Sequence, residues 1–133
     1  MAGLDTNVLV RWLVADDDTQ ADQAQRLFDA ATVADEPLFV PATVSLELEW
    51  VLRSRYRLDK ETVIAAFNAL LETRGLELES ESAIERALHA HRNGSVEFAD
   101  CLHAGLCQAA DRAPMFTFDA KAARVTGAAL VPG

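Results

Sequence analysis

Four acidic residues stand at points in the sequence where carboxylates could act together. Asp5 and Asp119 each follow a short apolar stretch and precede an expected helix, while Glu47 and Asp100 lie within expected helices. In open α/β sheets the ligand crevice lies outside the carboxyl ends of the strands. We therefore expect segments far apart in the sequence to bring these acids to one crevice.

The chemistry expected of such a cluster is metal-assisted phosphodiester cleavage. Several carboxylates held close together repel one another and raise each other's pKa. A hard divalent cation removes that penalty, and Mg²⁺ or Mn²⁺ prefers oxygen ligands. Such a cation can orient a phosphodiester, activate a water molecule and stabilise the leaving oxygen.

The two acids that follow strands also have an ordinary structural explanation. Asp5 and Asp119 stand where an aspartate commonly caps the N-terminus of a helix. Thr6 and Asn7 could support either role of Asp5 through hydrogen bonds. Taken alone, neither the Asp5 pattern nor the Asp119 pattern is strong evidence for a catalytic site.

A helix is expected over residues 43–55, and it carries Glu47. The apolar face of this helix is formed by Val44, Leu48, Val51 and Leu52. Glu47 falls at the border of that face, so we expect it to be held against the core. Glu49 falls well away, where an exposed pair with Arg53 explains it. The alternative for Glu47 is an edge-of-core glutamate that reaches solvent.

A long helix is expected over residues 96–110, with Ser95 as its N-cap, and it carries Asp100. Its predicted core face consists of Phe98, Leu102, Leu106 and Ala109. Asp100 lies roughly opposite, on a strip of small residues that suits either a site wall or simple helix packing. That strip also contains Ala104 and Cys107. Glu97 is explained by the preference for acids in a first helical turn.

Short strands alternate with helices along the chain. Strands are expected at 2–4, 37–41, 76–78, 115–118 and 129–131, and further helices at 6–14, 19–32, 60–73, 80–92 and from 119 to about 125. One acid of 16–18 and Asp59 are expected as N-caps, and helix 19–32 should bury Ala24, Leu27, Phe28 and Ala31. The pattern predicts a single α/β domain over residues 1–133, with a short central parallel β-sheet flanked by α-helices.

The composition argues against several classes of protein. The chain has 133 residues, half of them hydrophobic, and a net charge of −9, which argues against a general basic nucleic-acid-binding surface. Metal ions or local basic residues would have to offset the acids on a nucleic-acid path, and the candidates are Arg11, Arg53, Arg55, Arg57, Lys121 and Arg124. No membrane span, signal peptide or zinc spacing is found, so a cytoplasmic location is expected.

Four segments, in order, resemble the motifs of a known family. Residues 4–10 (LDTNVLV) resemble the opening of PIN-domain nucleases, and residues 41–53, containing ELEWVLR, resemble the second acidic segment of VapC-type toxins. Residues 98–104 (FADCLHA) resemble the third segment, and 117–121 (TFDAK) the fourth. Any one motif is moderately specific, whereas four in order across nearly the whole chain are strong.

The resemblance implies a Mg²⁺-dependent ribonuclease, the toxin of a type II toxin–antitoxin pair. Asp5, Glu47, Asp100 and Asp119 match the acidic quartet of the family; Asp5 and Asp100 are implied as metal ligands, and Glu47 and Asp119 as ligands directly or through water. Cys101 stands where alanine is frequent, and Glu97 also departs from the usual pattern. The resemblance further implies a homodimer and a VapB-type antitoxin, through which promoter DNA is bound indirectly.

Two rival interpretations belong to other classes. A catalytically silent PIN-fold module could engage a basic, antitoxin-like partner through the acidic pocket. A haloacid-dehalogenase-like phosphatase would need a second aspartate two positions after Asp5, where Asn7 stands instead. Transfer, ribosomal and messenger RNA are all compatible with the nuclease interpretation.

Overall fold

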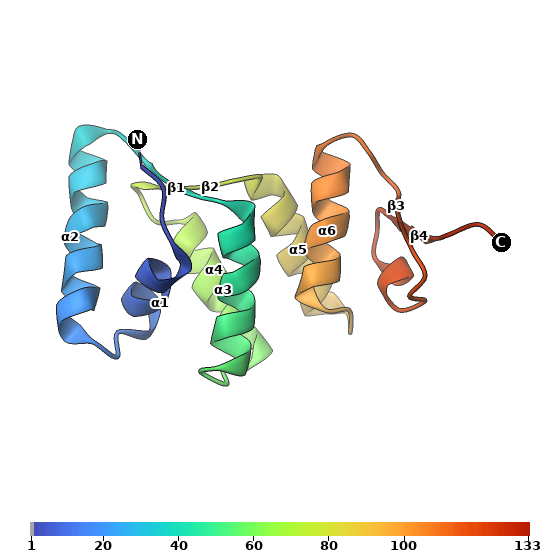
Figure 1. Ribbon diagram of the computed structural model, residues 1–133, viewed down its shortest axis with the longest axis horizontal. Coiled ribbons are helices and arrows are strands. Elements are labelled where there is room, and N and C mark those ends of the chain that lie inside the picture. The colour runs from blue at the N-terminus through green and yellow to red at the C-terminus, as the bar shows by residue number, and fades with distance from the viewer. Residues whose placement is uncertain (1) are drawn as a thin grey trace. The chain divides into compact units, whose positions relative to one another are not determined.

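The computed structural model describes residues 2–133, which divide into two compact units, one ending at Glu79 and the other running from Ser80 to Gly133 (Figure 1). The first unit contains α1 (Thr6–Val14), α2 (Asp18–Ala34), β1 (Leu38–Val40), α3 (Ala42–Ser54), α4 (Lys60–Leu71) and β2 (Leu76–Leu78). The second contains α5 (Glu81–Asn93), α6 (Phe98–Ala109), β3 (Met115–Thr117), the 3-10 helix η1 (Ala122–Arg124) and β4 (Ala128–Leu130).

Parallel pairing in the first unit brings the start of the chain beside β1. β1 pairs in parallel with β2, and Gly3 forms a parallel bridge to Phe39. The Leu4 N–H donates to the Phe39 carbonyl at 2.9 Å, and the Phe39 N–H donates to the Ala2 carbonyl at 2.8 Å. The strand expected at 2–4 is therefore present as a single bridge, after which Asp5 begins α1.

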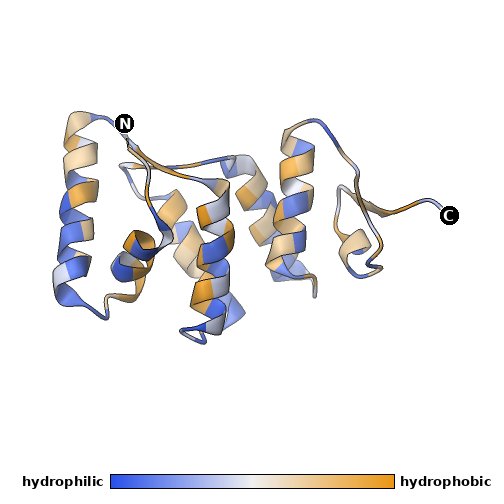
Figure 2. Ribbon diagram, in the orientation of Figure 1, coloured by the Kyte–Doolittle hydropathy of each residue, from blue (hydrophilic) through white to orange (hydrophobic). Residues whose placement is uncertain are grey.

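The core of the first unit is built from one apolar stripe on each helix. Hydrophobic and hydrophilic residues alternate along the helices in Figure 2, as expected for helices with one buried face. The largest fully buried side chains of this unit are Phe28, Phe67, Leu9, Leu48, Leu52 and Leu70. This packing fixes α1 against α2 and α3, and so sets the position of every residue that α1 carries.

The expected N-caps Asp17 and Asp59 are confirmed, with side chains that accept from the backbone N–H groups of Gln20 and Thr62. The prediction that Leu27 is buried was wrong, because it is 43% exposed. The buried stripe of α2 is the narrower set Ala24, Phe28 and Ala31, spaced i, i+4 and i+7.

The second unit is organised around the contact of α5 with α6. Gly105 lets the helices approach closely, since a Cβ at this position would lie 2.9 Å from the carbonyl oxygen of Ala83. The predicted core face of α6 was therefore partly wrong: Ala109 is exposed and Leu106 only half-buried. The buried residues are Phe98, Cys101, Leu102, Ala104 and Gly105.

Helix α6 begins later than expected, and Ser95 does not cap it. The N-cap position is Glu97, whose side chain makes no capping hydrogen bond. The preceding Val96 is buried, and Nδ1 of His91 donates to its carbonyl oxygen at 2.8 Å. This bond holds the segment after α5 in a non-helical path, so the helix starts only at Phe98.

The four strands form two parallel pairs, one in each unit: β1 with β2 and β3 with β4. One central sheet was expected from the alternation of strands and helices, which predicts parallel pairing but does not say which strands are neighbours. The helix expected from Asp119 to Val125 is present as the single 3-10 turn η1. The single-domain organisation stays a prediction.

No helix within residues 2–133 is long and apolar enough to cross a bilayer.

Gly75 provides a test of how β2 is joined to α2. Its φ is +87°, and a Cβ there would lie 2.7 Å from Oγ1 of Thr32 and 2.8 Å from the carbonyl oxygen of Phe28. We expect Gly75→Ala to lower the free energy of unfolding by about 2 kcal/mol or more, because left-handed strain and the backbone clash add. Urea denaturation measures the change.

Gly3→Ala is the matched control, because its Cβ would lie 3.5 Å from the Phe39 carbonyl, an ordinary contact. It should change the free energy of unfolding by less than about 1 kcal/mol. Equal destabilisation by the two substitutions would contradict the close approach at Gly75.

Asp59 provides a test of pH dependence. Hydrogen bonds from the side chain of Thr62, and then from its backbone N–H, lower the pKa of Asp59 below its ordinary value. A lowered pKa in the folded state adds stability above the pKa of the unfolded chain, and this is lost as the pH falls through the lowered pKa. Asp59→Asn should remove this part of the acid limb in urea unfolding curves measured against pH. Superimposable acid limbs would contradict it.

Candidate active site

Asp5 both caps α1 and faces an open hollow. Its Oδ1 accepts a hydrogen bond of 2.8 Å from the Thr6 N–H, as the ordinary explanation of this aspartate predicted. Its Oδ2 has no hydrogen-bond partner among residues 2–133, and the side chain is exposed. Capping uses one oxygen and leaves the other for a ligand, so the structural and the chemical role are compatible.

Glu47 is joined to α1 by the residue that follows Asp5. The hydroxyl of the buried Thr6 donates to Oε1 of Glu47, across 41 positions of sequence. Oε2 of Glu47 has no hydrogen-bond partner within the described chain. The supporting role suggested for Thr6 from the sequence therefore has a definite form: it orients the Glu47 carboxylate towards the start of α1.

The expectations for the two glutamates in α3 were wrong in part: Glu47 reaches solvent, which was the alternative for it, and Glu49 forms the expected pair with Arg53 but is buried. Glu47 is exposed, whereas Glu49 is only 4% exposed and accepts from Nε of Arg53 at 2.8 Å. The buried face of α3 consists of Ser45, Leu48, Glu49 and Leu52. This face is rotated from the expected one because Val44 and Val51 are only half-buried. Glu47 is thus held by Thr6 rather than by the core.

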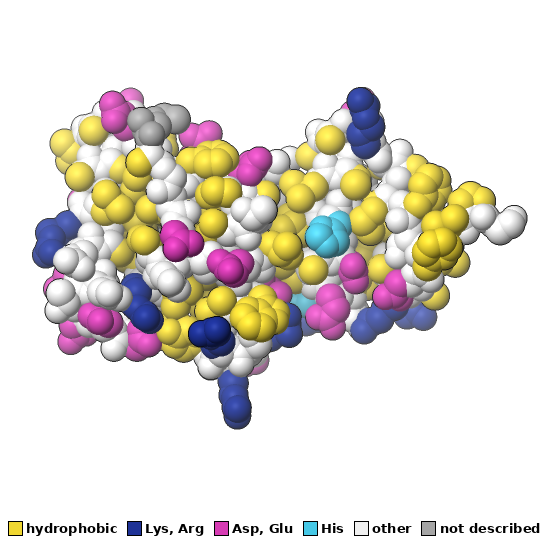
Figure 3. All heavy atoms as spheres, in the orientation of Figure 1, with side chains coloured by type: hydrophobic (Ala, Val, Ile, Leu, Met, Phe, Trp, Pro, Cys, Tyr) yellow, Lys and Arg dark blue, Asp and Glu magenta, His cyan; other side chains and the backbone are white. Residues whose placement is uncertain are grey.

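A polar hollow of about 370 Å³ contains both acids. It is lined by Asp5, Thr6, Asn7, Val10, Arg11, Glu47, Trp50, Val51, Arg55 and Tyr56. Figure 3 shows acidic side chains near one another over α1 and α3, with basic and hydrophobic side chains on the same face. Positive groups in the hollow can balance the carboxylates locally, despite the net charge of −9.

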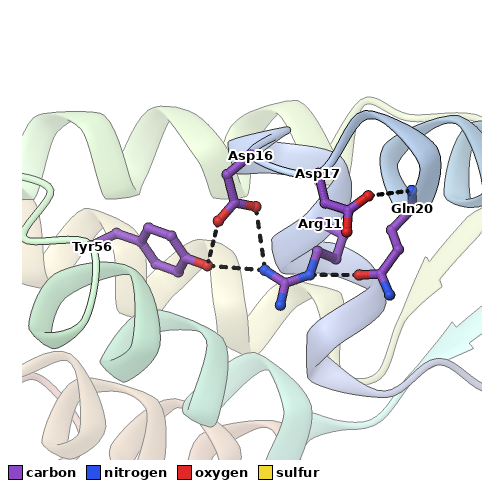
Figure 4. Close-up of polar contacts among 5 residues, drawn as sticks. All are labelled: Arg11, Asp16, Asp17, Gln20 and Tyr56. Atoms are coloured by element: carbon purple, nitrogen blue, oxygen red, sulfur yellow. Dashed lines mark hydrogen bonds and ion pairs between the residues drawn. The ribbon is translucent and has the colours of Figure 1, made fainter.

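Arg11 is fixed at the edge of this hollow by three side chains (Figure 4). Its Nη1 lies 3.2 Å from Oδ1 of Asp16 and 3.1 Å from the hydroxyl of Tyr56, and its Nε donates to Gln20 at 2.7 Å. The Tyr56 hydroxyl donates in turn to Asp16. The hydrogen bond with Tyr56, followed by the charge of Asp16, raises the pKa of Arg11. Arg11 therefore keeps its charge and its position.

The second unit holds the other acids named from the sequence. Asp100 lies half-buried in the first turn of α6, and Glu97 is exposed at the N-cap. Asp119 is exposed, and its Oδ1 accepts from the N–H groups of Lys121 at 2.8 Å and Ala122 at 3.4 Å in the turn that leads into η1. The prediction that Asp119 is an N-cap was wrong, because the N-cap position of η1 is Lys121 and no side chain caps it. Oδ2 of Asp119 makes no hydrogen bond with residues 2–133.

The donor set of the first hollow fits a hard cation. The unengaged atoms are carboxylate oxygens, Oδ2 of Asp5 and Oε2 of Glu47, and oxygen is the ligand that Mg²⁺ and Mn²⁺ prefer. Each unit contributes two acids of the predicted quartet. Within neither unit, as far as residues 2–133 describe it, do three or more acidic, histidine or cysteine side chains gather into a metal site.

Comparison with known proteins places these acids in a family. The sequence profile of the PIN domain matches residues 3–128, a span that includes Asp5, Glu47, Asp100 and Asp119. The chain belongs to the PIN domain family. It is also similar to a VapC ribonuclease of Aquifex aeolicus (strain VF5), with 26% identity over 99 residues, which cover 74% of this chain and 73% of that protein. The α/β class expected from the sequence agrees with the PIN family.

Some residues of the hollow were not identified as a group from the sequence. Arg11 and Arg55 were named from the sequence among six candidates for a nucleic-acid path, and Trp50 appeared only within the ELEWVLR segment. Tyr56 was not named at all, and it reaches Arg11 across 45 positions. No local pattern signals such a pair, because the two residues meet only after α1 and α3 have packed together.

The Thr6–Glu47 hydrogen bond provides a test of how the first hollow is assembled. A double-mutant cycle of Thr6→Val and Glu47→Ala should give an interaction free energy of about 1 kcal/mol, measured by urea unfolding. Glu47→Gln should keep most of it, because the amide oxygen can still accept. An interaction free energy near zero would show that the bond does not join α1 to α3 in solution.

Proposed function

We propose that this protein is a VapC-type endoribonuclease that cleaves RNA phosphodiester bonds at an acidic metal site. The observation that carries the proposal is the PIN-family match, which spans the four acids Asp5, Glu47, Asp100 and Asp119. The similarity to a VapC ribonuclease supports RNA as the substrate. The hollow of the first unit adds two unengaged carboxylate oxygens of the kind the reaction needs.

We propose different roles for the four acids. We infer that Asp5 and Asp100 would hold the cation, Mg²⁺ or Mn²⁺, and that Glu47 and Asp119 would complete the negative pocket and orient the attacking water. Thr6 keeps the Glu47 carboxylate in place, with Asn7 and Glu97 in supporting positions. When bound, the cation neutralises the clustered acids and stabilises charge on the phosphodiester.

The biological setting follows from the same family. We infer that the protein is the toxin of a toxin–antitoxin pair in the cytoplasm and is inhibited by a VapB-type antitoxin. The acidic pocket suits a basic inhibitory segment, because opposite charges favour such a contact. A homodimer is the proposed assembly, built from a single PIN-like domain over residues 1–133. Promoter DNA is bound only through the antitoxin.

The proposal is tested with purified, antitoxin-free protein and total cellular RNA, in Mg²⁺, in Mn²⁺ and in EDTA. Asp5→Ala and Asp100→Asn should each lower the cleavage rate at least about a hundredfold, because an acid that positions the cation supports several kcal/mol of transition-state stabilisation. Discrete fragments on a sequencing gel give the rate and the target.

Asp22→Asn is the matched control, since Asp22 is an exposed acid on α2 outside the hollow. Its cleavage rate should equal that of the wild type. Metal-dependent fragments that persist in Asp100→Asn, with an unchanged melting temperature, would overturn the assignment of the site. A wild-type protein that cleaves nothing but is stabilised by Mn²⁺ would favour the silent binding module.

A further inference from the structure

The hollow of the first unit contains more than the two acids: we propose that it also binds one unpaired RNA nucleotide next to the cleavage site. Trp50 stacks on the base, and Arg55 and Arg11 contact the adjoining phosphate. This inference rests on the proposed ribonuclease function and deepens it, because it identifies single-stranded RNA as the form of substrate that this hollow accepts.

Trp50 has the exposure that a stacking surface needs. It is 48% exposed on α3, three positions after Glu47, so both residues project from one side of the helix into the same hollow. Its indole N–H has no hydrogen-bond partner among residues 2–133. Trp12, in contrast, donates to Gln25 at 2.7 Å and packs edge-on against Phe28, with 5.3 Å between ring centroids.

Two guanidinium groups supply the positive charge for a phosphate. The second terminal nitrogen of Arg11 makes no hydrogen bond with the described residues, so the contacts in Figure 4 fix the side chain without using all its donors. Arg55 is exposed and its side chain also has no partner there. Phosphate oxygens are bound well by such unengaged guanidinium donors.

The local charge makes this hollow suitable for RNA in an acidic protein. The two carboxylates, Asp5 and Glu47, share the hollow with two arginines, Arg11 and Arg55, and Arg11 is also paired with Asp16 at 3.2 Å. The two guanidinium groups therefore offset, at short range, part of the repulsion of a phosphate by the net charge of −9. Single-stranded RNA is the form that offers a base face for an aromatic ring, because duplex bases are already stacked.

Quantitative binding separates the stacking residue from the phosphate-binding residues. Asp100→Asn, the cleavage-deficient background, is titrated with a short mixed-sequence single-stranded RNA in Mg²⁺ at several salt concentrations, using fluorescence anisotropy. Adding Trp50→Ala should weaken binding about tenfold, as expected for loss of one stacked base, and leave the salt dependence unchanged. Trp50→Phe should recover most of the affinity. The same RNA as a duplex should bind more weakly.

Adding Arg55→Gln should weaken binding and also reduce the slope of log K against log salt by about 0.7, the value for one phosphate contact on a single strand. Arg26→Gln, an equal charge change at an exposed site of α2 outside the hollow, should leave the slope unchanged. A merely structural role for Arg55 would not change the slope.

The outcomes distinguish this inference from the proposed function. If wild-type protein cleaves RNA but Trp50→Ala and Arg55→Gln bind like their parent, the nucleotide site is overturned and the nuclease is not. If wild-type protein neither cleaves nor binds RNA, both the nucleotide site and the proposed nuclease function are overturned. If Trp50→Ala instead changes the oligomeric state in light scattering and leaves RNA affinity intact, Trp50 belongs to an interface between copies, and the nucleotide site is again overturned.

Discussion

The hollow of the first unit depends on the hydrogen bond between the buried hydroxyl of Thr6 and the carboxylate of Glu47. A buried hydroxyl without a partner is costly, and the Thr6 hydroxyl finds its partner on another helix. The bond adds a polar link to the apolar packing of α1 on α3, and it turns the exposed Glu47 towards the start of α1. Asp5 is held at the same place by the bridge of Gly3 to β1 and by capping. Backbone pairing and one side-chain contact together form the hollow.

The hollow combines opposite charges with different degrees of order. Asp5 and Glu47 are each tied by one oxygen, Arg11 is tied by three neighbouring side chains, and Arg55 is exposed. An acidic protein that acts on a polyanion needs such a local balance, because its overall field repels the substrate. Arginines placed in the hollow act at short range, where that field matters least.

The local parts of the structure could be predicted from the sequence, and the relations between them only in part. The bounds of α1, the strands β1 and β2, and the caps Asp17 and Asp59 follow from apolar spacing and capping chemistry. Glu47 was expected at the core and Glu49 in solvent; the reverse holds, because tertiary packing rotated the buried face of α3. The Arg11–Tyr56 contact joins residues 45 positions apart, and no periodicity encodes it.

The ordering of Arg11 has a consequence for the thermodynamics of ligand capture. A long arginine side chain normally loses rotamer freedom when it binds an anion, and this loss opposes association. Arg11 has already lost that freedom in the unliganded fold through Asp16, Gln20 and Tyr56. The entropic penalty was therefore met during folding, and association through Arg11 should have a more favourable entropy than association through Arg55, which is exposed and makes no side-chain hydrogen bond with residues 2–133. Arg11 and Arg55, two arginines in one hollow, should thus differ in their contributions to the entropy of binding.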